Sequence, residues 1–132
     1  MRLFHRIQAG LLAVALLGLS GCGAKLNYKE TVTVEPDEAY QRRTFDGPLV
    51  EKATLTIKSP GVNVSAYVVL ASNSEAAVKA FKLGQTPKDV LTSKEKMQDA
   101  TFEVAPGKKP FDLFLVPAEG KKAEVSVTAT GK

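Results

Sequence analysis

Tryptophan is absent from this chain of 132 residues, and cysteine and histidine each occur once. The histidine is His5 and the cysteine is Cys22, so both lie near the start. The chain after Cys22 therefore cannot assemble a Ser-His-Asp or Cys-His catalytic apparatus, and it cannot ligate zinc through imidazole or thiolate. A lone cysteine also forms no disulfide within one copy, so a folded domain here must depend on an apolar core.

Phosphate-binding glycine motifs are missing as well. The ten glycines are scattered singly, and they match neither a P-loop nor a dinucleotide-binding fingerprint. The formal net charge of +4 is too small an excess to indicate nucleic-acid binding. We therefore expect no metal, no cofactor and no nucleic-acid partner.

No apolar run is long enough to cross a membrane. The longest covers residues 7–19, and it follows Arg2 and Arg6 without any acidic residue between. This is the n-region and h-region pattern of an export signal. As a helix the run would extend about 20 Å, against roughly 30 Å of bilayer hydrocarbon. The opening segment therefore predicts export, not a permanent transmembrane anchor.

The residues Leu19-Ser20-Gly21-Cys22 end this run and resemble the lipobox of bacterial lipoproteins. The resemblance implies that the Cys22 thiol takes a diacylglycerol, that signal peptidase II cuts between Gly21 and Cys22, and that acyl chains such as palmitate hold the protein on the membrane. A conventional signal would end in small residues and require no cysteine. Two or three acyl chains on one residue are sufficient for stable anchoring. We expect a cleaved signal peptide at 1–21, a lipidated N-terminus and short tether at 22–25, and a folded domain at 26–132.

The same resemblance carries an expectation about location. Gly23 follows the cysteine, whereas Asp at that position usually causes inner-membrane retention in Gram-negative members of the family. We therefore expect an exported protein that is lipid-anchored in the cell envelope, at the outer membrane if the organism is Gram-negative. Its first partner would be the membrane itself, through the lipid on Cys22. Removal of Arg2 and Arg6 with the signal lowers the formal charge from +4 to about +2.

Apolar and polar residues alternate along most of the remaining chain, which is the two-residue period of half-buried strands. The turn Ser59-Pro60-Gly61 lies between two such segments and predicts a hairpin. Short strands at this spacing favour a mainly β fold, an antiparallel, jelly-roll-like β-sandwich of six to seven strands. The expected strands cover residues 26–34, 40–45, 53–57, 62–70, 101–105, 111–116 and 123–130.

The period changes between residues 72 and 97. Ser72 and Glu75 have the spacing of a capping box, and the segment that follows favours a helix ending at Gly84. Thr86-Pro87 predicts a second helical turn, with threonine as the cap and proline at the first helical position. We expect a short helical insertion around 74–92.

The order of strands from residue 53 to 130 resembles the jelly-roll-type accessory sandwiches of secreted bacterial proteins, including pre-peptidase C-terminal-like domains. The segments that carry the resemblance are residues 53–57, 62–70, 104–107, 111–116 and 125–128. The chain departs from those domains in its long insertion and in lacking a loop cluster of Asp and Asn for calcium. The resemblance implies a fold class and no activity.

Tyr40, Arg42 and Arg43 form the best candidate recognition patch, because an exposed aromatic beside two guanidinium groups can bind a sugar or an anion. The alternative is an edge strand with solvated arginines. Four phenylalanines fall on apolar faces and are expected in the core: Phe45, Phe81, Phe102 and Phe114.

We therefore expect a non-enzymatic structural or interaction module of the envelope, with an envelope protein or glycan as its partner. The alternative is a β-sandwich that binds glycan, another envelope polymer or a small ligand, through the Tyr40 patch or through a groove formed by the insertion. A third hypothesis is an enzyme with two carboxylates. The acid pairs available, Asp37 with Glu38 and Glu119 with Glu124, lie in or beside expected turns, where acids are usually solvated.

Overall fold

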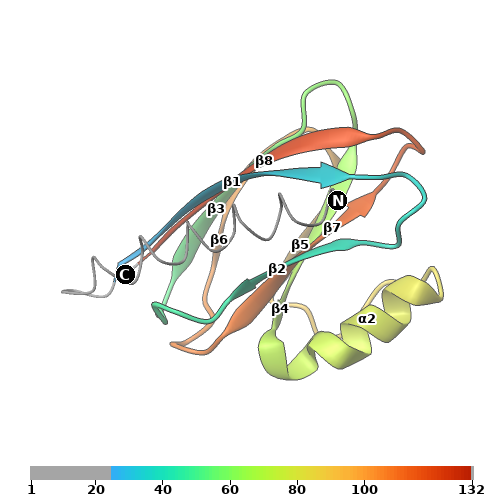
Figure 1. The fold of residues 1–132 in the computed structure, drawn as a ribbon. Coiled ribbons are helices and arrows are strands. Elements are labelled where there is room, and N and C mark those ends of the chain that lie inside the picture. The colour runs from blue at the N-terminus through green and yellow to red at the C-terminus, as the bar shows by residue number, and fades with distance from the viewer. Residues whose placement is uncertain (1–24, 132) are drawn as a thin grey trace, which may run out of the picture.

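Two four-stranded antiparallel sheets face each other in the computed structural model, which describes residues 25–131 (Figure 1). The first sheet has the order β1-β8-β3-β6, and the second has the order β2-β7-β4-β5. Successive strands alternate between the sheets except at β4 and β5, which are neighbours in the second sheet, and this is the strand order of a jelly roll. The expected antiparallel β-sandwich is confirmed, with eight described strands instead of six or seven.

The first sheet contains β1 (Leu26–Val34), β8 (Ala123–Gly131), β3 (Ala53–Lys58) and β6 (Asp99–Val104). The second contains β2 (Gln41–Phe45), β7 (Phe111–Pro117), β4 (Val64–Leu70) and β5 (Thr92–Met97). A 3₁₀ turn, η1 (Ala71–Asn73), and the helix α2 (Ser74–Lys82) follow β4.

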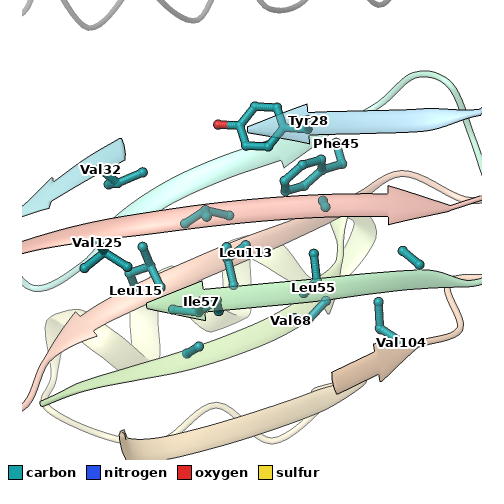
Figure 2. Packing of buried hydrophobic residues seen from close by; sticks show 14 of the residues in the cluster. Tyr28, Val32, Phe45, Leu55, Ile57, Val68, Val104, Leu113, Leu115 and Val125 are labelled. Carbon is teal, nitrogen blue, oxygen red and sulfur yellow. The ribbon is translucent and has the colours of Figure 1, made fainter. Parts of the chain in front are cut away.

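The main core lies between the two sheets, and the residues that alternate along the strands supply it. Figure 2 shows side chains from both sheets meeting there, including Leu55 and Ile57 of β3 and Leu113 and Leu115 of β7. The rings of Tyr28 and Phe45 meet edge to face at 4.9 Å and close one side of this core. The alternating pattern therefore predicted the inward faces correctly.

The expected hairpin between β3 and β4 is wrong. β3 pairs with β6 and β8 in one sheet, and β4 pairs with β5 and β7 in the other. Residues 59–61 form an arch between the sheets, in which the buried Ser59 hydroxyl donates to the Val62 carbonyl oxygen at 2.6 Å. An alternating pattern shows which face of a strand is buried but not which strand lies beside it, so a turn and an arch give the same signal.

The insertion is half helix and half strand. The helix α2 ends at Lys82 with Leu83 as the C-cap, and the next residue, Gly84, adopts a positive φ of 70° with its N–H bonded to the Phe81 carbonyl oxygen. The expected capping box is not formed, because Ser72 lies in the 3₁₀ turn and Asn73 is the N-cap residue. The expected second helical turn at Thr86-Pro87 is also absent, and the chain goes on to β5 instead.

A second apolar cluster fills the space between α2 and the outer face of the second sheet. Phe81 and Ala77 of the helix pack on Tyr67 and Val69 of β4 and on Phe114 of β7. Figure 1 shows the helix lying along that face. This packing explains why β4 and β7 are buried on both faces over most of their length.

Candidate functional site

The residues with the clearest sequence signal, Gly21 and Cys22, lie outside the described residues. The predicted signal cleavage and lipid attachment therefore stay predictions. The described chain begins at Lys25, and β1 begins one residue later.

Tyr40 lies just before β2 and is half-buried. Its ring is 5.3 Å from that of Phe114 and 5.9 Å from that of Phe81, measured between centroids. The tyrosine therefore borders the cluster under α2, where its ring contributes packing as well as exposed surface.

Arg42 lies on the same face of β2 as Tyr40 and forms an ion pair with Asp112 of β7. Its Nη2 lies 2.8 Å from Asp112 Oδ2, and its Nε donates to the same oxygen at 3.1 Å. The arginine side chain is 42% exposed, whereas the aspartate side chain has no exposed surface. The guanidinium carbon also lies 5.8 Å from the centroid of the Phe114 ring.

A hydroxyl from the helix completes this ion pair. Ser74, the first residue of α2, donates from its Oγ to Asp112 Oδ2. The other oxygen, Oδ1, has no hydrogen-bond partner among the described residues. Arg42 and Ser74 therefore join β2 and α2 to one buried carboxylate on β7.

Arg43 points to the opposite face of β2, where it crosses to the first sheet. It holds Glu30 of β1 with two hydrogen bonds, from Nε to Oε1 at 3.1 Å and from Nη2 to Oε2 at 3.2 Å. Tyr28 donates its hydroxyl hydrogen to the same carboxylate. Burial raises the pKa of Tyr28 well above its usual range, and the neighbouring Glu30 adds to that effect.

The structure therefore brings Tyr40 and Arg42 together around Phe114 and directs Arg43 elsewhere. Each guanidinium already faces a carboxylate, so neither presents an uncompensated charge for an anionic ligand. Sequence reasoning missed both carboxylates. Asp112 could have been noticed as a single acid inside an apolar strand, since a buried acid requires a partner.

A second buried tyrosine, Tyr67, belongs to the apolar cluster between α2 and the second sheet. Tyr67 of β4 donates to Glu95 Oε2 of β5 at 2.6 Å. Burial, followed by this hydrogen bond, raises the pKa of Tyr67 to about 12. Glu95 lies in a β-bulge where the next residue, Lys96, has a positive φ of 51° and its N–H bonds to Ser65 Oγ.

Residues 25–131 form at least two surface grooves. One, about 710 Å³, lies where β1 begins and β8 ends. The smaller, about 290 Å³, lies between α2 and the segment that follows it, with small side chains on its helix wall. The larger is lined by Lys25, Leu26, Asn27, Glu51, Lys52, Thr54, Glu103, Thr130 and Gly131.

The carboxylates weighed for catalysis make ordinary surface contacts. Glu38 accepts a hydrogen bond from Gln41 at 2.6 Å, and Glu119 accepts from the backbone N–H of Asn63. Glu124 accepts from Thr33 at 2.9 Å. These pairs do not converge on a shared apolar cleft in the part of the chain that the structure describes.

Between residues 25 and 131, no group of three or more His, Cys, Asp or Glu side chains is placed to hold a metal ion. In that same range no helix is both long and apolar enough to span a bilayer.

No family model matches the sequence, and no curated protein matches it. Solved structures do. The pre-peptidase C-terminal domain of a collagenase from Bacillus anthracis matches with a TM-score of 0.53 and 10% identity, over 79% of this chain and 89% of that one. The Yersinia pseudotuberculosis-derived mitogen matches with a TM-score of 0.54 and 6% identity, over 81% of this chain and 86% of that one. At such identities the likeness concerns the fold alone, and the resemblance to pre-peptidase C-terminal-like sandwiches is confirmed at that level.

Proposed function

We propose that this protein is a bacterial lipoprotein, anchored through acyl chains on Cys22, whose β-sandwich is a non-enzymatic structural or interaction module of the cell envelope. The observation that carries the proposal is the sequence Leu19-Ser20-Gly21-Cys22 behind a basic and then apolar segment.

The fold is compatible with such a role in two ways. The sandwich has a continuous apolar core of its own, so it requires neither a disulfide nor a metal for stability. Its β1 strand begins at Leu26, only four positions after Cys22, so an anchored domain would stay close to the membrane surface.

Membrane fractionation of a Cys22→Ser variant tests the anchor. We expect wild type to stay with the membrane after high-salt washing and the variant to lack the acyl mass and leave the membrane fraction or remain unprocessed. Ser20→Ala is the matched control, because it keeps a small residue at a neighbouring lipobox position and should change neither result. If Cys22→Ser still fractionates like wild type and has the same mass at its N-terminus, the proposal is wrong.

A second candidate function is the binding of an envelope glycan or small ligand, and the groove beside α2 favours it. Ala76 lies on the exposed wall of this groove, so Ala76→Trp would fill it without entering the core. Glu75→Trp is the control, since Glu75 is exposed on the same helix and does not line the groove. Pull-down with envelope polymers should show binding that Ala76→Trp removes and Glu75→Trp retains. Equal retention by both variants argues against this groove as the site.

Tyr40→Phe and Tyr40→Ala examine the predicted patch in the same pull-down. Tyr40→Phe keeps the ring on Phe114 and Phe81 and removes the hydroxyl group. A loss of binding with Tyr40→Ala alone would show that the ring is required, through stacking on the ligand or packing on Phe114 and Phe81, whereas a loss with both variants would indicate recognition by the hydroxyl. Binding retained by both variants argues against the patch.

A further inference from the structure

The strand register identifies the end of the sandwich that would face the membrane. Leu26 at the start of β1 is paired with Gly131 at the end of β8, and Gly131 is also paired with Ala53 at the start of β3. Figure 1 shows the first residues of β1 and the last of β8 at one end of the sandwich, beside the turn that follows β2. We call this the anchor end.

Three connections reach the anchor end, and two of them are loops held together by backbone hydrogen bonds. The third, residues 71–91, joins β4 to β5 and carries η1 and α2. The loop at residues 46–52 joins β2 to β3, and the loop at residues 105–110 joins β6 to β7. The N–H of Gly107 donates to the Glu51 carbonyl oxygen at 3.2 Å, and that of Lys108 donates to the Val50 carbonyl oxygen at 2.8 Å. β8 also lies tightly against the first loop, since a Cβ built on Gly131 would be 2.5 Å from the Lys52 carbonyl oxygen. The two loops and the end of β8 therefore form one continuous, well-packed surface at the anchor end.

Charge is arranged unequally between the two ends. Around the two joined loops of the anchor end, lysines outnumber acids by one, with Lys25, Lys52, Lys108 and Lys109 against Asp46, Glu51 and Glu103. These loops also present Leu49, a large apolar side chain that is 41% exposed. The loops of the opposite end have the reverse balance, with Glu35, Asp37, Glu38 and Glu119 against Lys121 and Lys122.

The distance from the anchor makes this asymmetry relevant. Two residues separate Cys22 from Lys25, and the three residue steps between them can span at most about 11 Å. This is close to the Debye length of about 8–10 Å, within which lysines are attracted to anionic headgroups. An exposed leucine between such lysines can enter the headgroup boundary.

We propose that the anchor end docks on the anionic lipid surface that carries the Cys22 anchor, with Lys52, Lys108 and Lys109 against headgroups and Leu49 inserted at the interface. The proposal rests on the proposed function, because the anchor brings this end to the membrane. Docking orients the sandwich, so the acidic end points away from the bilayer and α2 lies at the side of the domain.

The absence of tryptophan from the chain permits a direct optical test. Leu49→Trp in the native lipidated protein places one fluorophore at the proposed contact, and Leu83→Trp places one on an exposed position at the far end of α2, where Leu83 is 72% exposed. Each protein is reconstituted in vesicles of phosphatidylethanolamine with phosphatidylglycerol, and separately in phosphatidylcholine alone. Emission maximum and quenching by brominated lipids are measured, and the acyl mass is checked first.

We expect a blue-shifted emission and lipid quenching for Leu49→Trp in the anionic vesicles, and neither for Leu83→Trp. Charge reversal of Lys52, Lys108 and Lys109 in the Leu49→Trp protein should abolish the quenching, because the equilibrium constant for docking falls by about fivefold or more per lysine. Reversal of Lys121 and Lys122, at the opposite end, should leave it intact.

Anchoring and docking have separate readouts, the acyl mass for anchoring and the environment of the introduced tryptophan for docking. If the protein carries the acyl mass and floats with vesicles while Trp at position 49 stays fully water-exposed, docking is wrong and anchoring stands. Quenching that is equal in zwitterionic vesicles and insensitive to the lysines also contradicts the docking as proposed. A purified protein without acyl mass overturns both.

Discussion

Asp112, the second residue of β7, is a carboxylate without exposed surface. A buried charge is stable only when it is paired. Arg42 of β2 and Ser74 of α2 supply the pairing from positions that are 70 and 38 residues away in the sequence. Such partners cannot be inferred from local sequence, because only the folded topology brings them together.

Arg42→Ala should destabilise the domain by about 2 kcal/mol, because it leaves the Asp112 carboxylate with one hydroxyl partner. Urea unfolding followed by circular dichroism measures this change. Lys122→Ala is the control, since Lys122 and Glu124 are more than half exposed and 3.9 Å apart and such pairs contribute little. Equal changes in unfolding free energy for the two substitutions would show that the Arg42–Asp112 pair contributes no more than an exposed ion pair.

The raised pKa of Tyr67 predicts that the domain loses stability at alkaline pH. Its pKa is raised to about 12 in the folded domain, against about 10 in an unfolded chain. The folded state therefore holds the proton more tightly, so its contribution is complete below about pH 10 and is lost as the pH rises toward about 12.

Tyr67→Phe should flatten the fall in unfolding free energy across that range, even if it lowers stability at neutral pH by removing the bond to Glu95. Denaturant titrations at a series of pH values give both quantities. A slope identical to that of wild type would mean that Tyr67 titrates normally.

At the scale of elements, the sequence predicts strands well where one face is buried and badly where neither is. β1 and β8 alternate cleanly and were predicted almost to the residue. β5 was missed because it is an edge strand with four consecutive exposed residues, Ser93 to Lys96, so no apolar period marks it. The pairing of β3 could not be predicted either, since its partners β6 and β8 are distant in the sequence.

The candidate site was predictable to a smaller extent. Tyr40 and Arg42 were expected to share one surface, and the two-residue period of β2 places them there. The same period directs Arg43 to the other face, toward Glu30. The larger groove had no sequence signal of its own, because the segments that line it are distant in the sequence. The smaller groove lies within the insertion, between residues 73 and 89.

The helix α2 is held mainly by Phe81, which packs on Tyr67, Tyr40 and Phe114. Phe81→Ala should lower the unfolding free energy by about 3–5 kcal/mol. Leu83→Ala, two positions further on and 72% exposed, should change it by less than about 0.5 kcal/mol.

Amide hydrogen exchange shows whether Phe81→Ala releases α2 locally or weakens the whole domain. Faster exchange confined to residues 74–84 indicates local release, and uniform acceleration indicates a shared core. An unchanged stability would contradict the assignment of Phe81 as the main contact of the helix.

In the molecule as a whole, the proposed lipid anchor precedes a sandwich whose two ends differ in charge. Net charge alone does not reveal this arrangement, because the overall balance is small. The topology reveals it, since the two ends collect loops from distant parts of the sequence. A short tether and an oriented domain would leave the acidic loops and α2 accessible to partners within the envelope.

A lipidated Cys22 at the N-terminus of the mature protein is the prediction on which anchoring and docking both depend. Intact-mass and N-terminal fragment spectra of the protein extracted from membranes of its native host examine it. We expect a chain that begins at Cys22 and carries a diacylglycerol on its sulfur, with or without a further acyl chain on the amine. A mature chain that begins elsewhere, or a Cys22 with a free thiol, would contradict it.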